Sequence, residues 1–339
     1  MLTVQDIGEQ GILKIVQQFC PPELIQDDAA VLLPPVGRLL VVTSDVLVDG
    51  VHFSDRTTSP EDVGWRSAAV NLSDLAAMGA TPIGMTVGLS LPGNLAVDWV
   101  KRLYQGLSLC LQQFQTVIVG GDVVRSSLIS VAIAAFGAVL PHRVMRRSVA
   151  QPGDRIVVTG PHGASRAGLE LLLHPERGQT LSPDLRAHWI RAHQRPLPRL
   201  DVIPHLPWDL LEQTATAARI AGMDSSDGLA DAVIQLCRTS QVGARIDRGK
   251  IPLPEGLAAW VGRNQALDWA LYGGEDFELV LCLPPLAAAL LLQQLGAKAA
   301  CIGTITAEPG AWLVDSTGQF EDQPLVLEHG FQHFATSSL

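Results

Sequence analysis

The feature that most constrains the fold and function of this 339-residue sequence is the position of its carboxylates. Charged residues make up only 17% of the chain, yet acids recur directly beside apolar or glycine-rich stretches. Carboxylates in such places lie near a buried core, where an unpaired charge is costly. Six segments share this character: Asp27-Asp28, Thr43-Ser44-Asp45, Asn71-Leu-Ser-Asp74, Gly120-Gly121-Asp122, Asp224-Ser-Ser-Asp227 and Gly273-Gly-Glu-Asp276.

One of these segments lies inside a predicted helix. Ser59 can cap its N-terminus, and Pro60 suits the first helical position. The helix should run to about Met78 and end at Gly79. One stripe of it carries Ser67, Asn71, Asp74 and Met78. A carboxylate on this otherwise apolar segment needs a metal ion, another cation or several hydrogen-bond donors.

Each acidic segment also has an ordinary structural explanation. Asp27-Asp28 suits a solvated turn, Asp45 a cap, and Gly120-Gly121-Asp122 a hairpin turn. Asp224 and Asp227 suit the N-terminus of a following helix. Six such segments together make coincidence a poor explanation. Carboxylates and hydroxyls without a His/Cys cluster are the ligands of a hard cation, and Mg²⁺ fits best.

Composition excludes several classes of protein. The net charge of −10 argues against a general nucleic-acid binder and against docking on anionic membranes. No apolar run reaches the length of a membrane span, and the N-terminus has no signal-peptide pattern. The five cysteines are far apart and form no CxxC pair. We therefore expect reduced, mostly buried thiols in a cytoplasmic protein.

The order of predicted elements indicates an α/β (α+β) protein with two domains. We expect residues 1–148 to form the first domain and residues 149–339 the second, because the predicted turn Gln151–Asp154 separates two groups of predicted strands and helices. Strands are predicted over 39–43, 116–119, 131–140, 155–159, 243–246, 278–283 and 300–305. Further helices are predicted over 96–113, 165–173, 229–239 and 285–295, with a helix and irregular connection over 175–207.

The common nucleotide-binding loops are absent. The sequence contains neither a Walker A loop nor a G-x-G-x-x-G fingerprint. A phosphate enzyme built on this chain must therefore hold phosphate through metal ions, backbone N–H groups at glycine-rich turns and a few arginines.

In their order and spacing, these motifs are similar to those of a known family. The chain resembles the thiamine-monophosphate kinases of the aminoimidazole ribonucleotide synthetase-like superfamily nearly from end to end. The segments that carry the resemblance are Asp27-Asp28-Ala-Ala, Ser44–Phe53, Asn71–Ala80, Gly120-Gly121-Asp122, Pro152-Gly-Asp154, Ser226-Asp227-Gly228-Leu and Gly273–Phe277. The segment Asn71–Ala80 is close to diagnostic.

The resemblance implies Mg²⁺-dependent transfer of the ATP γ-phosphoryl group to thiamine monophosphate, the last step of thiamine diphosphate biosynthesis. It implies a homodimer that pairs through the N-terminal mixed sheet, with ATP and several Mg²⁺ ions near that interface. A C-terminal α/β domain would close over the site. Because the acceptor is already a phosphate oxygen anion, we expect no acid/base residue, only metal and electrostatic catalysis.

The resemblance also implies roles for individual residues. Metal ligands or their supports would be Asp28, Thr43, Ser44, Asp45, Asp74, Asp122, Asp224 and Asp227. ATP contacts would be Tyr104, Gly121, Asp122, Arg147 and Ser226, and substrate-side residues would be His52, Glu275 and Phe331. His52 alone would more often be a structural histidine.

The chain departs from the family pattern at four positions. Gln26 replaces a usual glycine, Ser225 a usual apolar residue, Phe277 a common tyrosine, and Phe331 a common tryptophan or tyrosine. Two alternatives to the kinase remain at this point: another ATP-dependent member of the superfamily, and a non-catalytic ATP-binding dimer that acts as a sensor or scaffold. The intact set of acids argues against the second.

Overall fold

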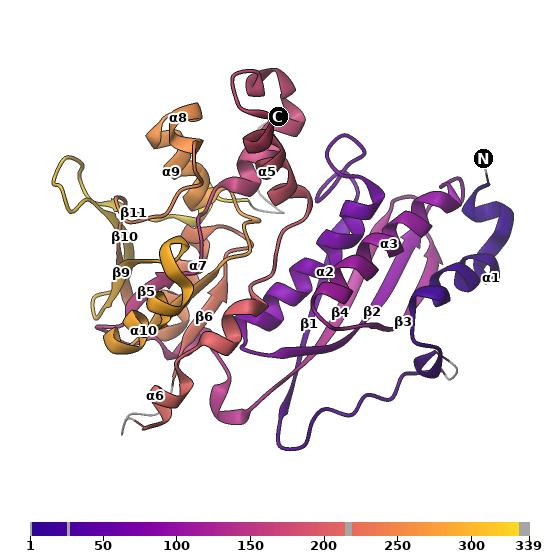
Figure 1. Ribbon diagram of the computed structural model, residues 1–339, viewed down its shortest axis with the longest axis horizontal. Coiled ribbons are helices and arrows are strands. Elements are labelled where there is room, and N and C mark those ends of the chain that lie inside the picture. Colours follow the sequence, from indigo (N-terminus) through magenta and orange to yellow (C-terminus); the bar gives the residue numbers. More distant parts are fainter. Residues whose placement is uncertain (1, 26–27, 214–218, 332–339) are drawn as a thin grey trace. The chain divides into compact units, whose positions relative to one another are not determined.

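The structure is a computed structural model that describes residues 2–25, 28–213 and 219–331 (Figure 1). The chain forms two compact units, each of which mixes helices with a sheet, as the sequence predicts. The first unit contains the chain up to Pro141 and also Gln194–Leu200. The second contains His142–His193 and the chain from Asp201 onward. This division lies a few residues before the predicted boundary at 148/149, and no local pattern signalled the return of Gln194–Leu200 to the first unit.

The first unit is built on a four-stranded sheet with the order β1-β4-β2-β3. Its strands are β1 (Leu39–Val48), β2 (Thr81–Leu91), β3 (Ile118–Arg125) and β4 (Ser130–Val139). Strand β4 pairs antiparallel with β1 and with β2, and β2 pairs parallel with β3. Side chains alternate between two faces, as a pleated strand requires. On β1, Leu47 is buried on one face, whereas Val42 and Val46 are 57% and 49% exposed on the other.

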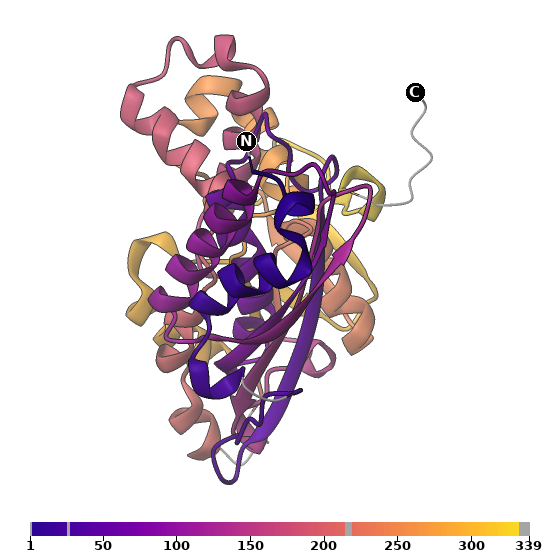
Figure 2. The same ribbon diagram turned by 90° about the vertical axis from the view of Figure 1, so that its right-hand side faces the viewer.

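Among the described residues of the first unit, the helices cover one face of this sheet. They are α1 (Val4–Val16), α2 (Pro60–Ala77) and α3 (Val97–Gln113), and Figure 2 shows them on the same side of the strands. The predicted start of α2 is confirmed: the Ser59 side chain accepts a hydrogen bond from Asp62 N at 3.2 Å.

Helices α2 and α3 approach each other at two glycines. A Cβ atom on Gly64 would lie 1.9 Å from the carbonyl oxygen of Leu103, and one on Gly106 would lie 1.8 Å from that of Glu61. Any side chain at either position would push the helices apart. These glycines thus hold α2, with its polar stripe, in a fixed place over the sheet.

The second unit is built on a seven-stranded sheet with the order β11-β10-β7-β9-β5-β8-β6. Its strands are β5 (Arg155–Val158), β6 (Ala221–Asp224), β7 (Gly243–Asp247), β8 (Leu279–Leu283), β9 (Ala300–Thr306), β10 (Gly310–Val314) and β11 (Gln323–Pro324). All pairings are antiparallel except the parallel pair β7/β10. Every residue of β8 is buried, which is typical of a strand covered on both faces.

Helices α7 (Leu229–Ser240) and α10 (Pro285–Leu295) pack on this sheet. The core under α7 includes Ile156, Val158, Val280 and Ile302. The other helices are α4 (Ala164–Leu173), α5 (Pro183–Gln194), α6 (Trp208–Gln213), α8 (Leu257–Val261) and α9 (Arg263–Tyr272). Helices α4, α5, α8 and α9 share a small second core around Trp189 and Trp269.

Two sequence predictions were wrong in the same way. Strand β1 was expected to end at Thr43, and Gly120-Gly121-Asp122 was expected to follow a strand that ends at Val119. Instead β1 continues to Val48 with one open face, and the glycines lie inside β3. In each case the apolar run covers only the first part of the strand, and polar or small residues continue the pairing with the neighbouring strand.

All five cysteines are free thiols, and Cys110, Cys237 and Cys282 are buried, as expected. In the described part of the chain, none of the helices combines the length and apolarity that a membrane span requires.

Candidate active site

The polar stripe of α2 meets strand β1. The Thr43 hydroxyl donates a hydrogen bond to Asp74 Oδ2, and Asn71 Oδ1 accepts one from the backbone N–H of Asp45 at 3.2 Å. The predicted stripe is therefore confirmed, and it faces the Thr43 and Asp45 side of the sheet. It brings Thr43, Asp45 and Asp74 together at one place in the first unit.

Asn71 is fully buried and uses both ends of its amide. Its Nδ2 group donates to the Ser67 carbonyl at 3.0 Å, while its oxygen holds Asp45. Ser67, also buried, donates to the Val63 carbonyl at 2.8 Å. Removing Asn71 would leave the partly buried Asp45 N–H without this partner, which costs about 1 kcal/mol.

The segment Gly120-Gly121-Asp122 lies on β3, at the opposite edge of the sheet. Asp45 is in register with Ile133, Val87 and Gly121 across the four strands. A Cβ atom on Gly121 would lie 2.1 Å from the Val87 carbonyl oxygen, so this position requires glycine. Three strand spacings separate the edge strands, which places Asp45 and the Gly121 region about 14 Å apart.

Asp122 is exposed on the open face of the sheet. Its register partners are Gly88, Ala132 and Val46, and all of them belong to the face away from α2. Ser44 lies on the same open face, and its hydroxyl donates to the Ile133 carbonyl at 2.8 Å. Within the described residues, no three Asp, Glu, His or Cys side chains are close enough to hold a metal ion together.

The remaining site candidates of the first unit are Asp28, His52 and Tyr104. Asp28 is exposed in an irregular segment, and Asp27 and Gln26 lie outside the described residues. His52 Nδ1 accepts from Val48 N at 3.1 Å, so the ring folds back on the end of β1. Tyr104 is buried on α3 beside Phe19, and burial raises the pKa of its hydroxyl.

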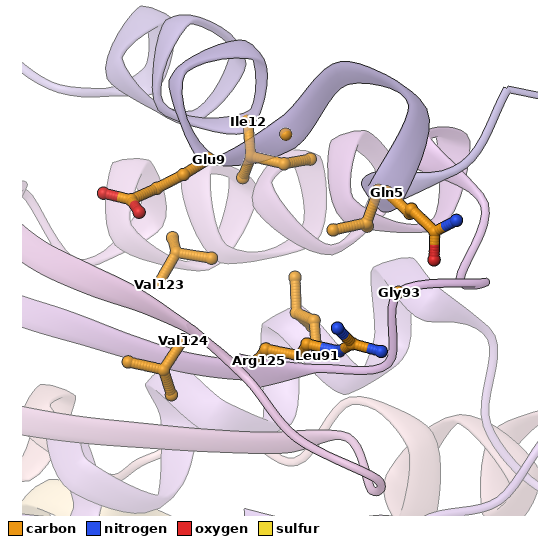
Figure 3. Close-up of a pocket in the computed structure, with 10 residues that line it drawn as sticks. Gln5, Glu9, Ile12, Leu91, Gly93, Val123, Val124 and Arg125 are labelled. Carbon is orange, nitrogen blue, oxygen red and sulfur yellow. The ribbon is translucent and has the colours of Figure 1, made fainter.

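The first unit also contains a pocket of about 210 Å³ between α1 and the ends of β2 and β3 (Figure 3). Apolar side chains such as Ile12, Leu91 and Val123 line it, together with Gln5, Glu9 and Arg125. It begins one residue beyond Asp122 on β3, but none of the predicted site residues lines it.

In the second unit, three loops meet at one edge of the sheet. Strands β5 and β6 both run antiparallel to β8, so the segments after β5 and β6 and the segment before β8 share one edge. Asp224 is buried at the end of β6, Ser226 Oγ donates to Asp224 Oδ1 at 3.1 Å, and Asp227 is exposed. Glu275 N donates to the Ser226 carbonyl at 2.7 Å, which ties the third loop to the second.

The loop before β8 has an unusual backbone. Glu275 and Phe277 adopt positive φ angles of 59° and 53°, a region that residues with a side chain rarely occupy. Asp276 holds the loop in place: its carboxylate accepts from Gly163 N at 2.6 Å and Ser165 N at 3.0 Å, at the start of α4. Burial raises the pKa of Asp276 to about 7.

A buried histidine contacts the predicted substrate-side acid. His193 Nδ1 lies 3.4 Å from Glu275 Oε2 and 3.2 Å from Ser165 Oγ. Sequence reasoning missed His193, Asp276 and a second buried histidine, His162, which contacts Ser225 at 3.1 Å. A single histidine or acid has no local pattern, so only the fold could place these residues at the site.

The two remaining candidates of this unit lie at its surface. Arg147 is exposed in a short 3₁₀ turn, and its carbonyl accepts from Ser240 Oγ at 2.8 Å. Phe331 is 58% exposed at the end of the described chain.

Comparisons with known proteins match both halves of the chain. Residues 26–139 match the family model "AIR synthase related protein, N-terminal domain", and residues 151–315 match the corresponding C-terminal domain. The thiamine-monophosphate kinase of Synechococcus elongatus is 52% identical over 98% of both chains. The enzyme of the same name from Escherichia coli is 37% identical over 92% of both.

Solved structures agree with the sequence matches. The thiamine-monophosphate kinase from Stenotrophomonas maltophilia has a TM-score of 0.73 at 36% identity, over 85% of this chain and 89% of that one. AaThiL complexed with AMPPCP and TMP has a TM-score of 0.70 at 29% identity, over 96% and 99%. A hydrogenase maturation protein in complex with ATP, only 18% identical, shares the fold with a TM-score of 0.74. The chain therefore belongs to the AIR synthase-related family and, within it, to the thiamine-monophosphate kinases.

Proposed function

We propose that this chain transfers the γ-phosphoryl group of ATP to the phosphate of thiamine monophosphate, giving ADP and thiamine diphosphate. This is the last step of thiamine diphosphate biosynthesis. The observation that carries the proposal is the contact between Thr43 on β1 and Asp74 on α2, beside Asp45. A fixed group of oxygen ligands next to a sheet is what phosphoryl transfer needs, because that reaction depends on positioning and charge compensation.

The residues fit Mg²⁺ by the chemistry of their donors. Asp45, Asp74 and Thr43 supply only carboxylate and hydroxyl oxygens, which a hard cation prefers to imidazole or thiolate. Further ligands or supports would be Asp28, Ser44, Asp122, Asp224 and Asp227. Bound Mg²⁺ would neutralise phosphate oxygens and stabilise the charge of the transition state.

This chain needs no general base for the reaction. The acceptor oxygen of thiamine monophosphate is already an anion, and the difficulty is to bring two polyanions together. Two like charges about 4 Å apart repel by roughly 4 kcal/mol at an effective dielectric constant near 20. The role of the site residues is therefore to hold cations and to orient both phosphates, and Arg147 would add positive charge on the ATP side.

The nucleotide and the acceptor would use different residues. The residues that we propose to contact ATP are Gly121, Asp122, Arg147, Ser226 and Tyr104. Of these, Tyr104 is buried on α3. For thiamine monophosphate we propose His52, Glu275 and Phe331. The thiazolium ring is a cation, so the Glu275 carboxylate would offset its charge and the exposed Phe331 ring would stack on it.

We propose further that the protein is a homodimer that pairs through the open face of the first unit's sheet. Leu40, Val42, Val46 and Val124 are between 49% and 57% exposed there. An apolar sheet face of this kind is typical of an interaction surface. The expected ligands Ser44 and Asp122 lie on the same face, which agrees with a site close to the interface.

We place the enzyme in the cytoplasm. All five cysteines are free thiols, which supports a reducing compartment, because the cysteines of secreted proteins are normally oxidised to disulfides.

The test of the proposed function is ADP release with thiamine monophosphate as acceptor, titrated with Mg²⁺. We expect ADP release to depend on both the acceptor and the metal ion. ADP release that does not change when thiamine monophosphate is omitted would contradict the proposal.

A further inference from the structure

Ser225 is a departure from the family pattern that the structure explains. It lies between Asp224 and Ser226, where an apolar residue is usual, and it is fully buried. Its backbone N–H donates to the Glu278 carbonyl at 2.9 Å, and its hydroxyl accepts from Glu278 N at 3.1 Å. A buried hydroxyl also needs an acceptor for its own proton.

His162 provides that acceptor. It is fully buried in the loop after β5, and burial lowers its pKa to about 4, so the ring is neutral. Its Nδ1 atom lies 3.1 Å from the Gly160 carbonyl oxygen, which can only accept. The ring proton is therefore on Nδ1, and the lone pair of Nε2 accepts the Ser225 hydroxyl proton at 3.1 Å.

These bonds join the three loops of the second unit's site. From Gly160 they pass through His162 and Ser225 to Glu278. The Thr159 hydroxyl, next to Gly160 in the chain, also donates to Glu278 Oε2 at 2.5 Å and so joins the first loop directly to the third. If one of these side chains is removed, its neighbour keeps a buried polar group without a hydrogen-bond partner. Removing His162 and removing Ser225 should therefore disturb the same turn, Asp224–Asp227.

We propose that His162 is a positioning residue that acts through Ser225: it fixes the Asp224–Asp227 turn so that Asp224 and Ser226 are in place for the cation and the nucleotide. This inference rests on the proposed function, because it assigns a support to residues of that site. It also accounts for Ser225, since the hydroxyl takes its place in a hydrogen-bonded pair where the family usually has an apolar contact.

The experiment is a double-mutant cycle on the full-length protein. Binding of the ATP analogue AMPPCP with Mg²⁺ is measured by calorimetry for the wild type, His162→Leu, Ser225→Ala and the double variant. Loss of one buried hydrogen bond should weaken binding about tenfold in each single variant. The double variant should bind no more weakly than the weaker single one, because both changes remove the same bond.

Two further variants separate positioning from stability. His162→Gln keeps an acceptor near the Nε2 position and should recover most of the affinity. Ile246→Ala, at a buried position on β7, should lower the melting temperature but leave AMPPCP binding unchanged. In steady-state assays, the KM for ATP should rise in His162→Leu while the KM for thiamine monophosphate stays within about twofold.

The outcomes distinguish this inference from the proposed function. Normal AMPPCP affinity in His162→Leu, or losses that multiply in the double variant, would overturn the positioning role alone. A wild-type protein that binds no AMPPCP in the presence of Mg²⁺ would overturn the proposed function and this inference with it.

Discussion

The side-chain oxygen of Asn71 accepts a hydrogen bond from the backbone N–H of Asp45 at 3.2 Å, and this bond joins helix α2 to strand β1. Asn71 is fully buried, and its amide nitrogen is held by the Ser67 carbonyl. The helix therefore sets the position of the strand segment that carries Thr43 and Asp45. The metal ligands that we propose in the first unit depend on this contact between the helix and the strand.

Replacing Asn71 should lower both stability and metal affinity. Asn71→Ala leaves the partly buried Asp45 N–H without its acceptor, so we expect the free energy of unfolding to fall by about 1 kcal/mol. Denaturation with urea measures this change, and a Mg²⁺ titration of activity measures the second. Ser67→Ala is the matched control, because its hydroxyl only bonds a carbonyl of the same helix. An Asn71→Ala protein as stable as Ser67→Ala would contradict the role of this bond.

Removing either Asp45 or Asp74 should lower turnover strongly and leave the fold intact. We expect Asp45→Asn and Asp74→Asn to lower kcat by at least about 100-fold, which corresponds to about 2.7 kcal/mol. Stability should change little, or even rise, because each substitution removes a partly buried charge. Asp98→Asn, at an exposed position on α3, is the control for activity. Wild-type turnover in both site variants across a Mg²⁺ titration would refute the assignment.

The buried carboxyl of Asp276 predicts a dependence of stability on pH. Burial raises its folded pKa from an ordinary 3.8 to about 7, so the folded state keeps a proton that the unfolded state releases. This contribution to stability is complete below about pH 4 and is lost as pH rises through about 7. The stability of the wild type relative to Asp276→Asn should therefore fall between about pH 5 and pH 8.

Asp315 supplies a control of opposite sign. Hydrogen bonds from Thr317 lower its pKa, so its contribution is complete above the ordinary value and is lost only on acidification. Wild type and Asp315→Asn should keep a constant stability difference between about pH 5 and pH 8. If the Asp276→Asn difference is constant as well, the raised pKa of Asp276 is wrong.

A charge on the open sheet face should prevent dimerisation. Val42 and Val46 point away from α2, and both are about half exposed. Val42→Asp and Val46→Asp would place a charge in the proposed interface, where burial of an unpaired charge is costly. Light scattering coupled to size exclusion should report a dimer for the wild type and a monomer for each variant. The control Leu286→Asp, on α10 of the second unit, should remain dimeric. A monomeric wild-type protein would contradict the proposed interface.

The sequence alone predicted much of the fold where the signals are local. The helix with Ser59 at its cap has a complete start signal and a clear end at Gly79, and the structure confirms both. The polar stripe of that helix follows from helical periodicity, so Asp74 could be placed toward a partner before the partner was known. Helix α10 was predicted with its observed limits, because Pro285 and Gly296 mark its two ends.

Features that depend on distant contacts could not be predicted in this way. Gly120 and Gly121 look like a turn, but they pair with Thr86 and Val87 of β2 and so continue a strand. At Gly121 the Val87 carbonyl approaches too closely for a side chain. His162 and His193 have no surrounding motif, and they become part of the site only when three loops meet at one edge of the sheet. The role of Ser225 likewise depends on its partner, which lies 63 positions away in the chain.

The most direct test of the central claim is chromatographic detection of thiamine diphosphate. The full-length protein is mixed with ATP, Mg²⁺ and thiamine monophosphate, and a parallel sample contains a chelator in excess over the metal. The account predicts thiamine diphosphate in equal amount to ADP in the first sample and none in the second. Bound ATP with no thiamine diphosphate in either sample would contradict it, and would favour a different acceptor or a non-catalytic ATP-binding protein.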